Sequence, residues 1–399
     1  MPPLSACSTA EEVAAVGRDM AGKTVVITGG AAGIGAETAR VLAGKGAKVI
    51  IGCRNVAAGQ AVADAAKAEG AKVRGREAGV GEGRRCGGWL ELAHAEGGGG
   101  RLRARADPAP QTFLPLRPLP PDTHTRARSP LSHVFLSLPL HFPQGTISVR
   151  ALDLADLASV TAFASAVCAE EARLDVLLNN AGVMACPELR TADGFELQMG
   201  TNHEGHWLLT ERLLPKLKAS PSPPARVVCV ASLAHTTPGA LDVTDINWRT
   251  RPYDRIKAYG ASKLANVLHA KALASRHDPG AVLAFSLHPG VIQTDLFRHV
   301  GGAPGTWAGA ALAAVGGAVR GVGSLILGRP LMKTVPQGAA TSVFAITSPT
   351  LDASKNGFYL ADCAPCAPSA AGRDGALAAA LWAATEKEVG EAMAKRGIK

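Results

Sequence analysis

A tyrosine and a lysine stand four residues apart in the segment Tyr259-Gly260-Ala261-Ser262-Lys263. Side chains at positions i and i+4 lie on the same face of an α-helix, so the phenol and the ammonium group are expected to face the same space. A positive charge there stabilises the tyrosinate and lowers the tyrosine pKa from about 10 toward neutral pH. Tyr259 is then able to exchange a proton with a carbonyl or alcohol oxygen, with Lys263 as its electrostatic partner.

Ser232 and Asn202 are two further candidates for this chemistry. Ser232 follows an apolar run at Arg226–Ala231 that has the pattern of a buried strand. A hydroxyl at a strand end can hold a substrate oxygen and stabilise developing charge; a turn or helix cap is the alternative role. Asn202 lies in a segment predicted to be helical, and because asparagine is a poor helix former we expect a special role there.

A glycine-rich turn, Thr28-Gly29-Gly30-Ala31-Ala32-Gly33-Ile34-Gly35, follows the first apolar run and opens a helical segment. We expect Gly29 to permit the tight turn, Gly33 to let the backbone approach a pyrophosphate, and Gly35 to allow the helix to pack closely on the sheet. The phosphates would lie at the helix N-terminus, where free N–H groups and the helix dipole favour anions. The pattern predicts a dinucleotide site.

The second apolar run ends in Ile51-Gly52-Cys53-Arg54-Asn55. A site selective for NAD places an acidic residue here to hold the ribose 2′-hydroxyl, whereas the planar cation of Arg54 suits a 2′-phosphate. The sequence therefore predicts NADP(H) in preference to NAD(H). An exposed arginine at a helix start is the alternative interpretation.

Short apolar runs alternate with longer helical segments, which is typical of βαβ units and of a parallel sheet between two helix layers. We predict an α/β fold with a single domain, a Rossmann-type doubly wound parallel sheet of about seven strands. In such a sheet Asn179-Asn180-Ala181-Gly182 closes a strand at the edge where ligands bind. Predicted strands are 23–28, 48–52, 147–152, 175–179, 226–231 and 282–287, and predicted helices include 55–70, 156–172, 193–219 and 254–277.

The composition is that of a large folded chain, with 399 residues of which 47% are hydrophobic. That fraction excludes a wholly disordered protein. The net charge is a modest +9 without long basic blocks, so no nucleic-acid partner is expected. Eight scattered cysteines indicate reduced thiols in an intracellular protein, and the N-terminal residues lack the apolar core of a secretory signal.

Residues 73–144 interrupt the alternating pattern. This segment of 72 residues contains ten Arg but no Lys, and it lacks Asn, Ile, Met and Tyr. The missing types have AT-rich codons, so we hypothesise a retained GC-rich intron; a genuine low-complexity, disordered insertion is the alternative. In either case the predicted domain comprises residues 1–72 and 145–399, and the insertion carries no chemistry.

Three weaker patterns favour structural roles. Cys363-Ala364-Pro365-Cys366 lacks the second cysteine pair of a zinc site, and His203 and His206 lack a third ligand, so no metal is predicted. The stretch Gly301–Val319 is uncharged, which is long enough to suggest a membrane span. Its many glycines instead favour an apolar substrate lid at 301–333 that contacts a membrane surface peripherally.

Taken in order along the chain, the motifs resemble those of the short-chain dehydrogenase/reductase superfamily. They read TGxxxGxG, CRN, DL (Asp153-Leu154), NNAG, NH, S, YxxxK and HPG (His288-Pro289-Gly290), and the resemblance covers residues 9–72 and 145–390. The segments STAEEVAAVGRD, NHEGHWLLT, YGASKLANVLHA, LHPGVIQTDL and PQGAATS are similar to the retinol-dehydrogenase and WW-domain-oxidoreductase branch. Within it they are most similar to plant and algal members related to the chloroplast-translocon-associated dehydrogenase.

The resemblance implies a role for each motif residue. Tyr259 would be the general acid/base, Lys263 its pKa partner and a ribose ligand, and Ser232 the group that orients the carbonyl. Asn202 would hold a proton-relay water. The implied cofactor contacts are Gly29, Ala32, Gly33, Ile34, Gly35, Arg54, Asn55, Asp153, Leu154, Asn180, Ala181, Gly182, Tyr259, Lys263, Pro289, Gly290, Ile292 and Thr294.

Two departures from the branch stand close to these motifs. Glu204 occupies a position that is usually apolar, and Ala231 replaces the first serine of a common Ser-Ser pair. Neither is one of the four catalytic candidates, but Glu204 beside Asn202 leaves the substrate preference open.

These observations predict an NADP(H)-dependent oxidoreductase that interconverts a lipophilic alcohol and its aldehyde or ketone. A dinucleotide-binding regulatory or scaffold subunit of a membrane complex, such as a chloroplast translocon, is the alternative. A cytoplasmic or organelle-membrane location is expected, the chloroplast envelope included. The sequence specifies neither the substrate within this class nor the oligomeric state.

Overall fold

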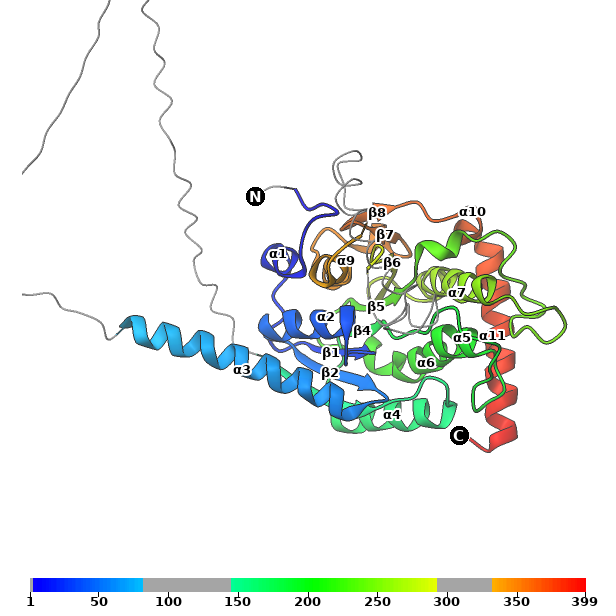
Figure 1. The fold of residues 1–399 in the computed structure, drawn as a ribbon, viewed down its shortest axis with the longest axis horizontal. Coiled ribbons are helices and arrows are strands. Elements are labelled where there is room, and N and C mark those ends of the chain that lie inside the picture. The colour runs from blue at the N-terminus through cyan, green and yellow to red at the C-terminus, as the bar shows by residue number, and fades with distance from the viewer. Residues whose placement is uncertain (1–2, 82–144, 293–331) are drawn as a thin grey trace, which may run out of the picture. The chain divides into compact units, whose positions relative to one another are not determined.

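The computed structural model describes residues 3–81, 145–292 and 332–399. The chain divides into two units, Met1–Gly75 with Phe142–Lys399, and Arg76–His141. The first unit contains the sheet and all the described candidate site residues, and its elements are labelled in Figure 1.

The described residues form one eight-stranded sheet in the order β3-β2-β1-β4-β5-β6-β7-β8. Strands β1 to β7 pair in parallel, and only β8 is antiparallel to its neighbour. The predicted Rossmann-type α/β fold is confirmed, with one more strand than predicted. The strands are β1 (Thr24–Thr28), β2 (Lys48–Cys53), β3 (Thr146–Ala151), β4 (Val176–Asn179), β5 (Ala225–Val230), β6 (Val282–His288), β7 (Tyr359–Ala361) and β8 (Ala364–Cys366).

The additional strand β8 forms because the chain reverses directly after β7. Asp362 and Cys363 have left-handed φ values of 51° and 59°. Two successive left-handed residues make the turn that suits a two-residue hairpin, so Ala364–Cys366 folds back on β7. The cysteine pair noted in the sequence therefore belongs to a hairpin, in which Cys363 is buried and Cys366 is exposed.

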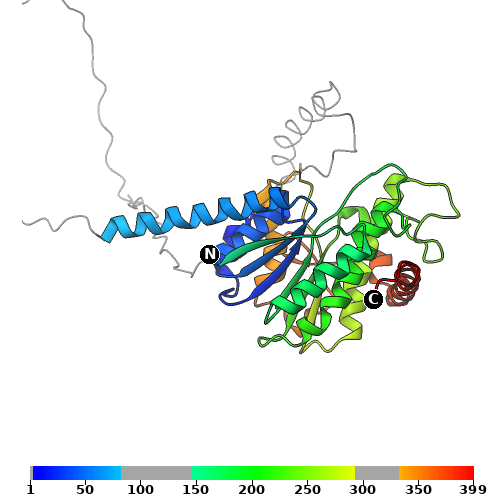
Figure 2. The ribbon, with the colours of Figure 1, turned by 90° about the horizontal axis from the view of Figure 1, so that it is seen from below.

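Helices cover both faces of the twisted sheet (Figure 2). On one face α2 packs against α9, and α9 against α1; on the other α4 packs against α6, and α11 against α7. The helices are α1 (Ala10–Val16), α2 (Gly33–Gly44), α3 (Val56–Gly81), α4 (Leu157–Glu170), α5 (Leu197–Met199), α6 (Gly205–Lys218), α7 (Arg255–Arg276), α9 (Val335–Thr347), α10 (Ala370–Arg373) and α11 (Gly375–Arg396), with a π-helical turn η1 (Gly200–Glu204) and 3₁₀ turns η2 (Leu233–Thr236) and η4 (Ala353–Lys355).

Two helical segments differ from the sequence prediction. Helix α3 continues past Gly70 to Gly81, because residues 71–78 include Ala, Lys, Arg and Glu, which favour helix strongly enough to tolerate one glycine. The predicted helix 193–219 is instead α5, the π-turn η1 and α6. Residues 82–144, most of the predicted insertion, lie outside the described part of the chain, so the domain boundary there stays a prediction.

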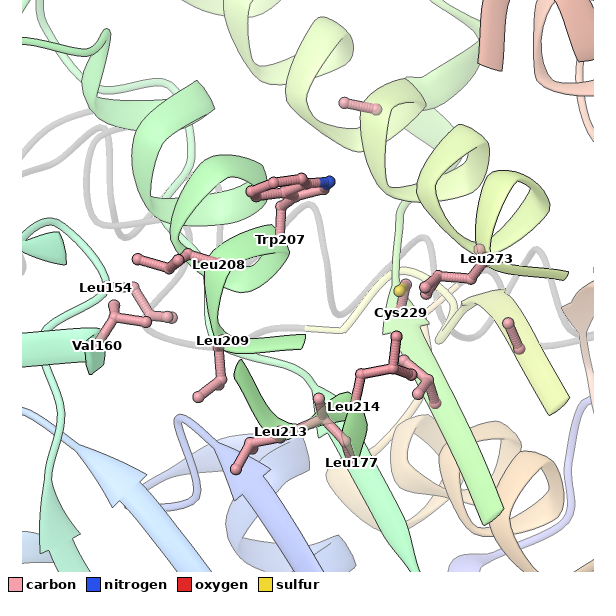
Figure 3. Close-up of a cluster of buried hydrophobic side chains, with 14 of the residues drawn as sticks. Leu154, Val160, Leu177, Trp207, Leu208, Leu209, Leu213, Leu214, Cys229 and Leu273 are labelled. Atoms are coloured by element: carbon pink, nitrogen blue, oxygen red, sulfur yellow. The ribbon is translucent and has the colours of Figure 1, made fainter. Parts of the chain in front are cut away.

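Alternate strand residues enter two separate cores, one under each helix layer. Val26 and Leu177 join the core that contains Trp207 of α6 (Figure 3). Their sequence neighbours Ile27 and Leu178 join the core that contains residues of α2 and α9. Burying each such side chain contributes about 2 kcal/mol, and a one-residue slip of a strand would exchange the two sets. The two cores therefore fix the strand register, and with it the positions of the strand ends.

Arg226 on β5 connects the sheet to the end of α9. Its guanidinium is buried and donates to the carbonyl oxygens of Ala345 (2.7 Å), Ser348 (2.9 Å) and Leu351 (2.8 Å). Carbonyl groups at a helix C-terminus lack internal donors and favour a cation. Burial lowers the pKa of Arg226 to about 9, which reflects the desolvation cost that these three bonds offset.

Replacement of Arg226 by Met should lower the free energy of unfolding by about 3 kcal/mol, because three carbonyl oxygens are left buried without a donor. Urea unfolding followed by circular dichroism measures this loss. Arg150→Met is the matched control, since it removes a surface ion pair with Glu170 and should change stability little. Equal losses in the two variants would contradict the role given to Arg226.

Candidate active site

A cavity of about 770 Å³ opens at the carboxyl ends of the parallel strands. This is the edge where ligands bind in doubly wound sheets, next to the point between β1 and β4 where the strand order reverses. Asn202 does not line the cavity, and Thr294 lies outside the described residues. The other predicted site residues all line the cavity: Gly29, Ala32, Gly33, Ile34, Gly35, Arg54, Asn55, Asp153, Leu154, Asn180, Ala181, Gly182, Ser232, Tyr259, Lys263, Pro289, Gly290 and Ile292.

The glycine-rich turn requires glycine at Gly29 and Gly35, and Gly33 also has a left-handed φ of 55°. Gly29 has a left-handed φ of 69°, and a Cβ added to it would lie 2.9 Å from the Cα of Ala181. A Cβ on Gly35 would lie 2.5 Å from the carbonyl oxygen of Gly29. Helix α2 begins at Gly33, and Ala32 before it supplies no side-chain cap. The N–H groups of the first helical turn are therefore available to an anion in the cavity.

Thr28 joins the ends of β1 and β4. Its Oγ1 accepts from the backbone N–H groups of Asn180 (2.9 Å) and Ala181 (3.0 Å). In the opposite direction, the Asn180 side chain donates to the carbonyl oxygen of Thr28 at 2.8 Å. These bonds hold the glycine turn and the Asn180–Gly182 segment side by side on the cavity wall.

Three polar residues lie at the other side of the cavity, after β2 and β3. Asn55 caps α3 through a 3.0 Å bond from the N–H of Ala58 to its Oδ1. One carboxylate oxygen of Asp153 accepts from the N–H of Ala155 at 3.0 Å. Arg54 is exposed, and its guanidinium has no hydrogen bond or ion pair with any residue in the described ranges. That cation is therefore available to a ligand in the cavity.

Tyr259 and Lys263 lie on α7, which Asp254 caps, and both face the cavity. The ammonium of Lys263 lies 5.8 Å from the centre of the Tyr259 ring and donates to the carbonyl oxygen of Val230 at 3.0 Å. Ser232 lies on the same wall. Its Oγ accepts from the N–H of Ala234 at 3.2 Å, so the capping role considered for this serine is present as well.

Burial dominates the titration of the tyrosine and the lysine. It raises the pKa of Tyr259 to about 12, while a hydrogen bond with Ser232 acts in the opposite direction. Burial lowers the pKa of Lys263 to about 8. The lowered tyrosine pKa predicted from the sequence is therefore not produced by the chain's own residues, because desolvation of the tyrosinate outweighs its other interactions.

Asn202 lies on the π-turn η1, where its side chain makes three hydrogen bonds. Its Oδ1 accepts from the N–H of Val183 (2.8 Å), and its Nδ2 donates to the carbonyl oxygen of Val183 (2.9 Å) and to Oγ of Ser262 (2.9 Å). Asn202 thus holds the Val183 segment against α7, one residue from Lys263. Single π-turns inside helices are frequent at functional sites, in keeping with the special role predicted for this asparagine.

Comparison with known proteins decides the family. Residues 23–97 and 126–244 match the family model of short chain dehydrogenases. The chain is 34% identical to human retinol dehydrogenase 12 over 361 residues, which are 90% of this chain and 84% of that protein. It is also 34% identical to mouse retinol dehydrogenase 14 over 379 residues, 93% of this chain and 87% of the relative. The chain belongs to the short-chain dehydrogenase/reductase superfamily.

A solved structure of an uncharacterised protein from Mycobacterium paratuberculosis is also similar. It is 28% identical with a TM-score of 0.58, and the match covers 94% of this chain and 97% of that one. The complex of RhlG with NADP from Pseudomonas aeruginosa shares the fold, at 20% identity and a TM-score of 0.51 over 90% of this chain and 98% of the other. The resemblance predicted from the motifs is thus confirmed, including the likeness to retinol dehydrogenases.

Some residues in the site of this short-chain dehydrogenase were not predicted from its sequence. His288 lines the cavity, and its Nδ1 accepts from the N–H of Leu233 at 3.2 Å. Its place in the HPG motif was the only signal for it. Met184, Leu233 and Val291 add apolar surface to the lining. They lie on separate segments, Leu233 at the start of η2, that meet only in the fold, so no spacing in the sequence marks them.

The structure also bears on the predictions about membranes and metals. No helix within residues 3–81, 145–292 and 332–399 is long and apolar enough to cross a bilayer. In the same ranges no group of His, Cys, Asp and Glu side chains is arranged to hold a metal ion. Residues 301–331 of the predicted lid lie outside the described ranges.

Glu204, the departure noted beside Asn202, is completely buried at the end of η1. Its Oε1 accepts from Nδ2 of Asn247 at 3.0 Å, whereas its Oε2 has no hydrogen-bond partner among the described residues. Burial raises the pKa of Glu204 to about 8; nearby Glu388 adds to this, and Arg249 opposes it. The carboxyl group is therefore protonated at neutral pH.

This protonation makes stability depend on pH. The pKa of Glu204 is about 8 in the folded state against 4.5 for an ordinary glutamate, so the folded state holds the proton that the unfolded state releases between these values. Stability should fall as pH rises from 5 to 8, by on the order of 3 kcal/mol. Glu204→Gln should remove this contribution, as measured by urea unfolding at a series of pH values.

The matched control is Glu391→Gln, which changes an exposed carboxyl group and should leave the pH profile as in the wild type. If Glu204→Gln and Glu391→Gln gave the same profile, the burial argument for Glu204 would be wrong.

Proposed function

We propose that this short-chain dehydrogenase uses NADP(H) to interconvert a lipophilic alcohol and its aldehyde or ketone. One observation carries the proposal: Ser232, Tyr259 and Lys263 line the same cavity as the glycine-rich turn. A proton-transferring tyrosine and a dinucleotide cradle in one cavity are what hydride transfer to a carbonyl requires. The named retinol dehydrogenases among the relatives support a lipophilic substrate.

The residues of the cavity fit a nicotinamide dinucleotide, which supplies or accepts the hydride when bound. A Cβ on Gly29 or Gly35 would meet backbone atoms of the chain itself, so only glycine allows the turn that lines the cavity to form. The uncapped first turn of α2 would hold the phosphates. Arg54 would bind the 2′-phosphate, and its neighbours Cys53 and Asn55 offer no carboxylate for a 2′-hydroxyl, which supports NADP(H) over NAD(H).

The chain's own side chains would handle the proton. In reduction the Tyr259 hydroxyl donates its proton to the substrate carbonyl oxygen, and in oxidation the tyrosinate takes it back. Ser232 Oγ accepts from Ala234 N–H and keeps its own proton to donate to the same substrate oxygen. Lys263 places a cation on this wall, 5.8 Å from the centre of the Tyr259 ring, where a positive charge favours the tyrosinate. The hydrogen bond with Ser232 offsets part of the desolvation that raises the pKa of Tyr259.

Apolar surface around these groups suits a lipophilic substrate. Leu233 is 56% exposed and Val291 43% exposed, although both line the cavity. Exposed aliphatic side chains at a cavity are typical of a site for an apolar ligand. A peripheral membrane contact through 301–333 and an intracellular location, the chloroplast envelope included, are part of the same proposal.

The proposal is tested by NADPH oxidation with a panel of lipophilic aldehydes and ketones. Tyr259→Phe should reduce kcat by at least about a hundredfold, because it removes the transferred proton, while NADPH binding stays within about threefold. Tyr253→Phe is the matched control: this tyrosine bonds Glu196 and lies outside the cavity lining, and the variant should keep its turnover.

Undiminished turnover by Tyr259→Phe would contradict the assigned chemistry. Tight NADPH binding by a wild type that turns over no carbonyl would favour the alternative, a dinucleotide-binding regulatory or scaffold subunit.

Arg54→Gln tests the coenzyme preference. Loss of a cation beside the 2′-phosphate should weaken NADPH binding by about tenfold to a hundredfold, measured by quenching of tryptophan fluorescence. NADH lacks this phosphate and serves as the internal control, with an unchanged dissociation constant. Equal weakening of NADPH and NADH binding would show that Arg54 does not bind the 2′-phosphate.

A further inference from the structure

His206 occupies the first turn of α6, buried between the catalytic candidates and the glycine turn. Its Nδ1 lies 2.9 Å from the backbone carbonyl oxygen of Asn202. Its Nε2 lies 2.8 Å from Oγ1 of Thr28. The imidazole therefore bridges the π-turn that carries Asn202 and the end of β1.

The partners of the ring determine where its proton lies. A carbonyl oxygen only accepts, so the Nδ1 of His206 carries the hydrogen and donates to Asn202. In the neutral ring the Nε2 is then an acceptor, and the Thr28 hydroxyl must donate to it. The other acceptor within reach of that hydroxyl, the carbonyl oxygen of Leu178, is 3.5 Å away, at the outer limit for a hydrogen bond.

The direction of the Thr28 proton decides what its oxygen offers to the cavity wall. With the hydrogen directed at His206, both lone pairs of Oγ1 remain for the N–H groups of Asn180 and Ala181, at 2.9 and 3.0 Å. Every hydrogen-bonding position of the hydroxyl is then used, and Thr28, His206 and Asn202 are all buried. The hydrogen bonds then form a chain with a single direction. The N–H groups of the Asn180 segment donate to Thr28, Thr28 donates to His206, and His206 donates to Asn202.

Burial keeps the ring neutral, as this order requires. It lowers the pKa of His206 to about 4, and the charge of Lys263 acts in the same direction. A protonated ring would present a hydrogen at Nε2 and force the Thr28 hydroxyl to turn away. The arrangement therefore persists across the physiological pH range.

We propose that His206 is a positioning residue whose Nδ1–H tautomer orients the Thr28 hydroxyl and thereby sets the Asn180–Gly182 segment and the Asn202 turn in register with each other. The coenzyme part of this inference rests on the proposed function. His206 does not itself line the cavity, so it acts through its partners Thr28 and Asn202.

The chain contains a matched pair for comparison. His203 lies on the π-turn η1 beside Asn202 and also bonds a buried threonine through its Nε2, which is 3.0 Å from Oγ1 of Thr385 on α11. Thr385 and Thr28 are equally buried. Only Thr28 also accepts hydrogen bonds from residues of the cavity wall. Comparing variants of the two threonines therefore distinguishes a positioning role from a general contribution to packing.

The first test needs no variant and no coenzyme. Nitrogen-15 NMR of the imidazole groups in the wild-type protein should show His206 with the hydrogen on Nδ1, unchanged from pH 6 to pH 8. A resonance assigned to His206 with the hydrogen on Nε2, or a ring that titrates within this range, overturns the proposal whatever the protein's activity.

The second test measures NADPH binding by fluorescence. Thr28→Val should weaken binding about tenfold, because the Ala181 N–H loses its acceptor and the Asn180 N–H keeps only the carbonyl oxygen of Leu178, at 3.1 Å. Thr28→Ser, which keeps the hydroxyl, should restore binding to within about threefold of the wild type. Thr385→Val should leave the dissociation constant unchanged while costing comparable stability in urea unfolding.

His206→Phe completes a double-mutant cycle with Thr28→Val. On its own it should weaken NADPH binding about tenfold; in the Thr28→Val background it should add little, because both changes remove the same interaction. Additive effects, or equal effects of Thr28→Val and Thr385→Val, would refute the proposal. A wild type that binds no dinucleotide would refute the proposed function instead, and the NMR measurement would still decide the tautomer.

Discussion

The close approach of the β1 and β4 ends is the constraint on which the rest of the site depends. The backbone of Gly29 lies against Ala181 so closely that a single added carbon would meet its Cα at 2.9 Å. Thr28 then completes the junction with bonds to the Asn180 and Ala181 N–H groups. Because parallel strands end at one edge, this junction places the glycine turn beside Asn180–Gly182 and opens the cavity between them.

Burial gives the same cavity its electrostatic character. Tyr259 holds its proton more strongly and Lys263 less strongly than in water, since both lose solvation in the wall. Tyr259 is therefore protonated at neutral pH, whereas Lys263, with a pKa of about 8, still carries most of its charge there. The same physical effect keeps His206 neutral and Glu204 protonated on the π-turn.

Much of this arrangement follows from the sequence because its motifs come directly after apolar runs. Gly29 follows β1, Arg54 follows β2 and Ser232 comes just after β5, so a parallel sheet brings them to one edge. The π-turn around Asn202 was not predictable, since it depends on contacts with Val183 and Ser262 from other elements. The predicted lowering of the Tyr259 pKa was wrong, because the spacing of two residues on a helix does not show how deeply the tyrosine is buried.

A crystal structure of the protein with bound NADP⁺ would show whether one cavity holds the dinucleotide beside the Ser232–Tyr259–Lys263 group. The pyrophosphate should lie at the first turn of α2, the 2′-phosphate at Arg54 and the nicotinamide ring beside Tyr259. A dinucleotide bound elsewhere, or in this cavity with its nicotinamide directed away from Tyr259, would contradict this arrangement.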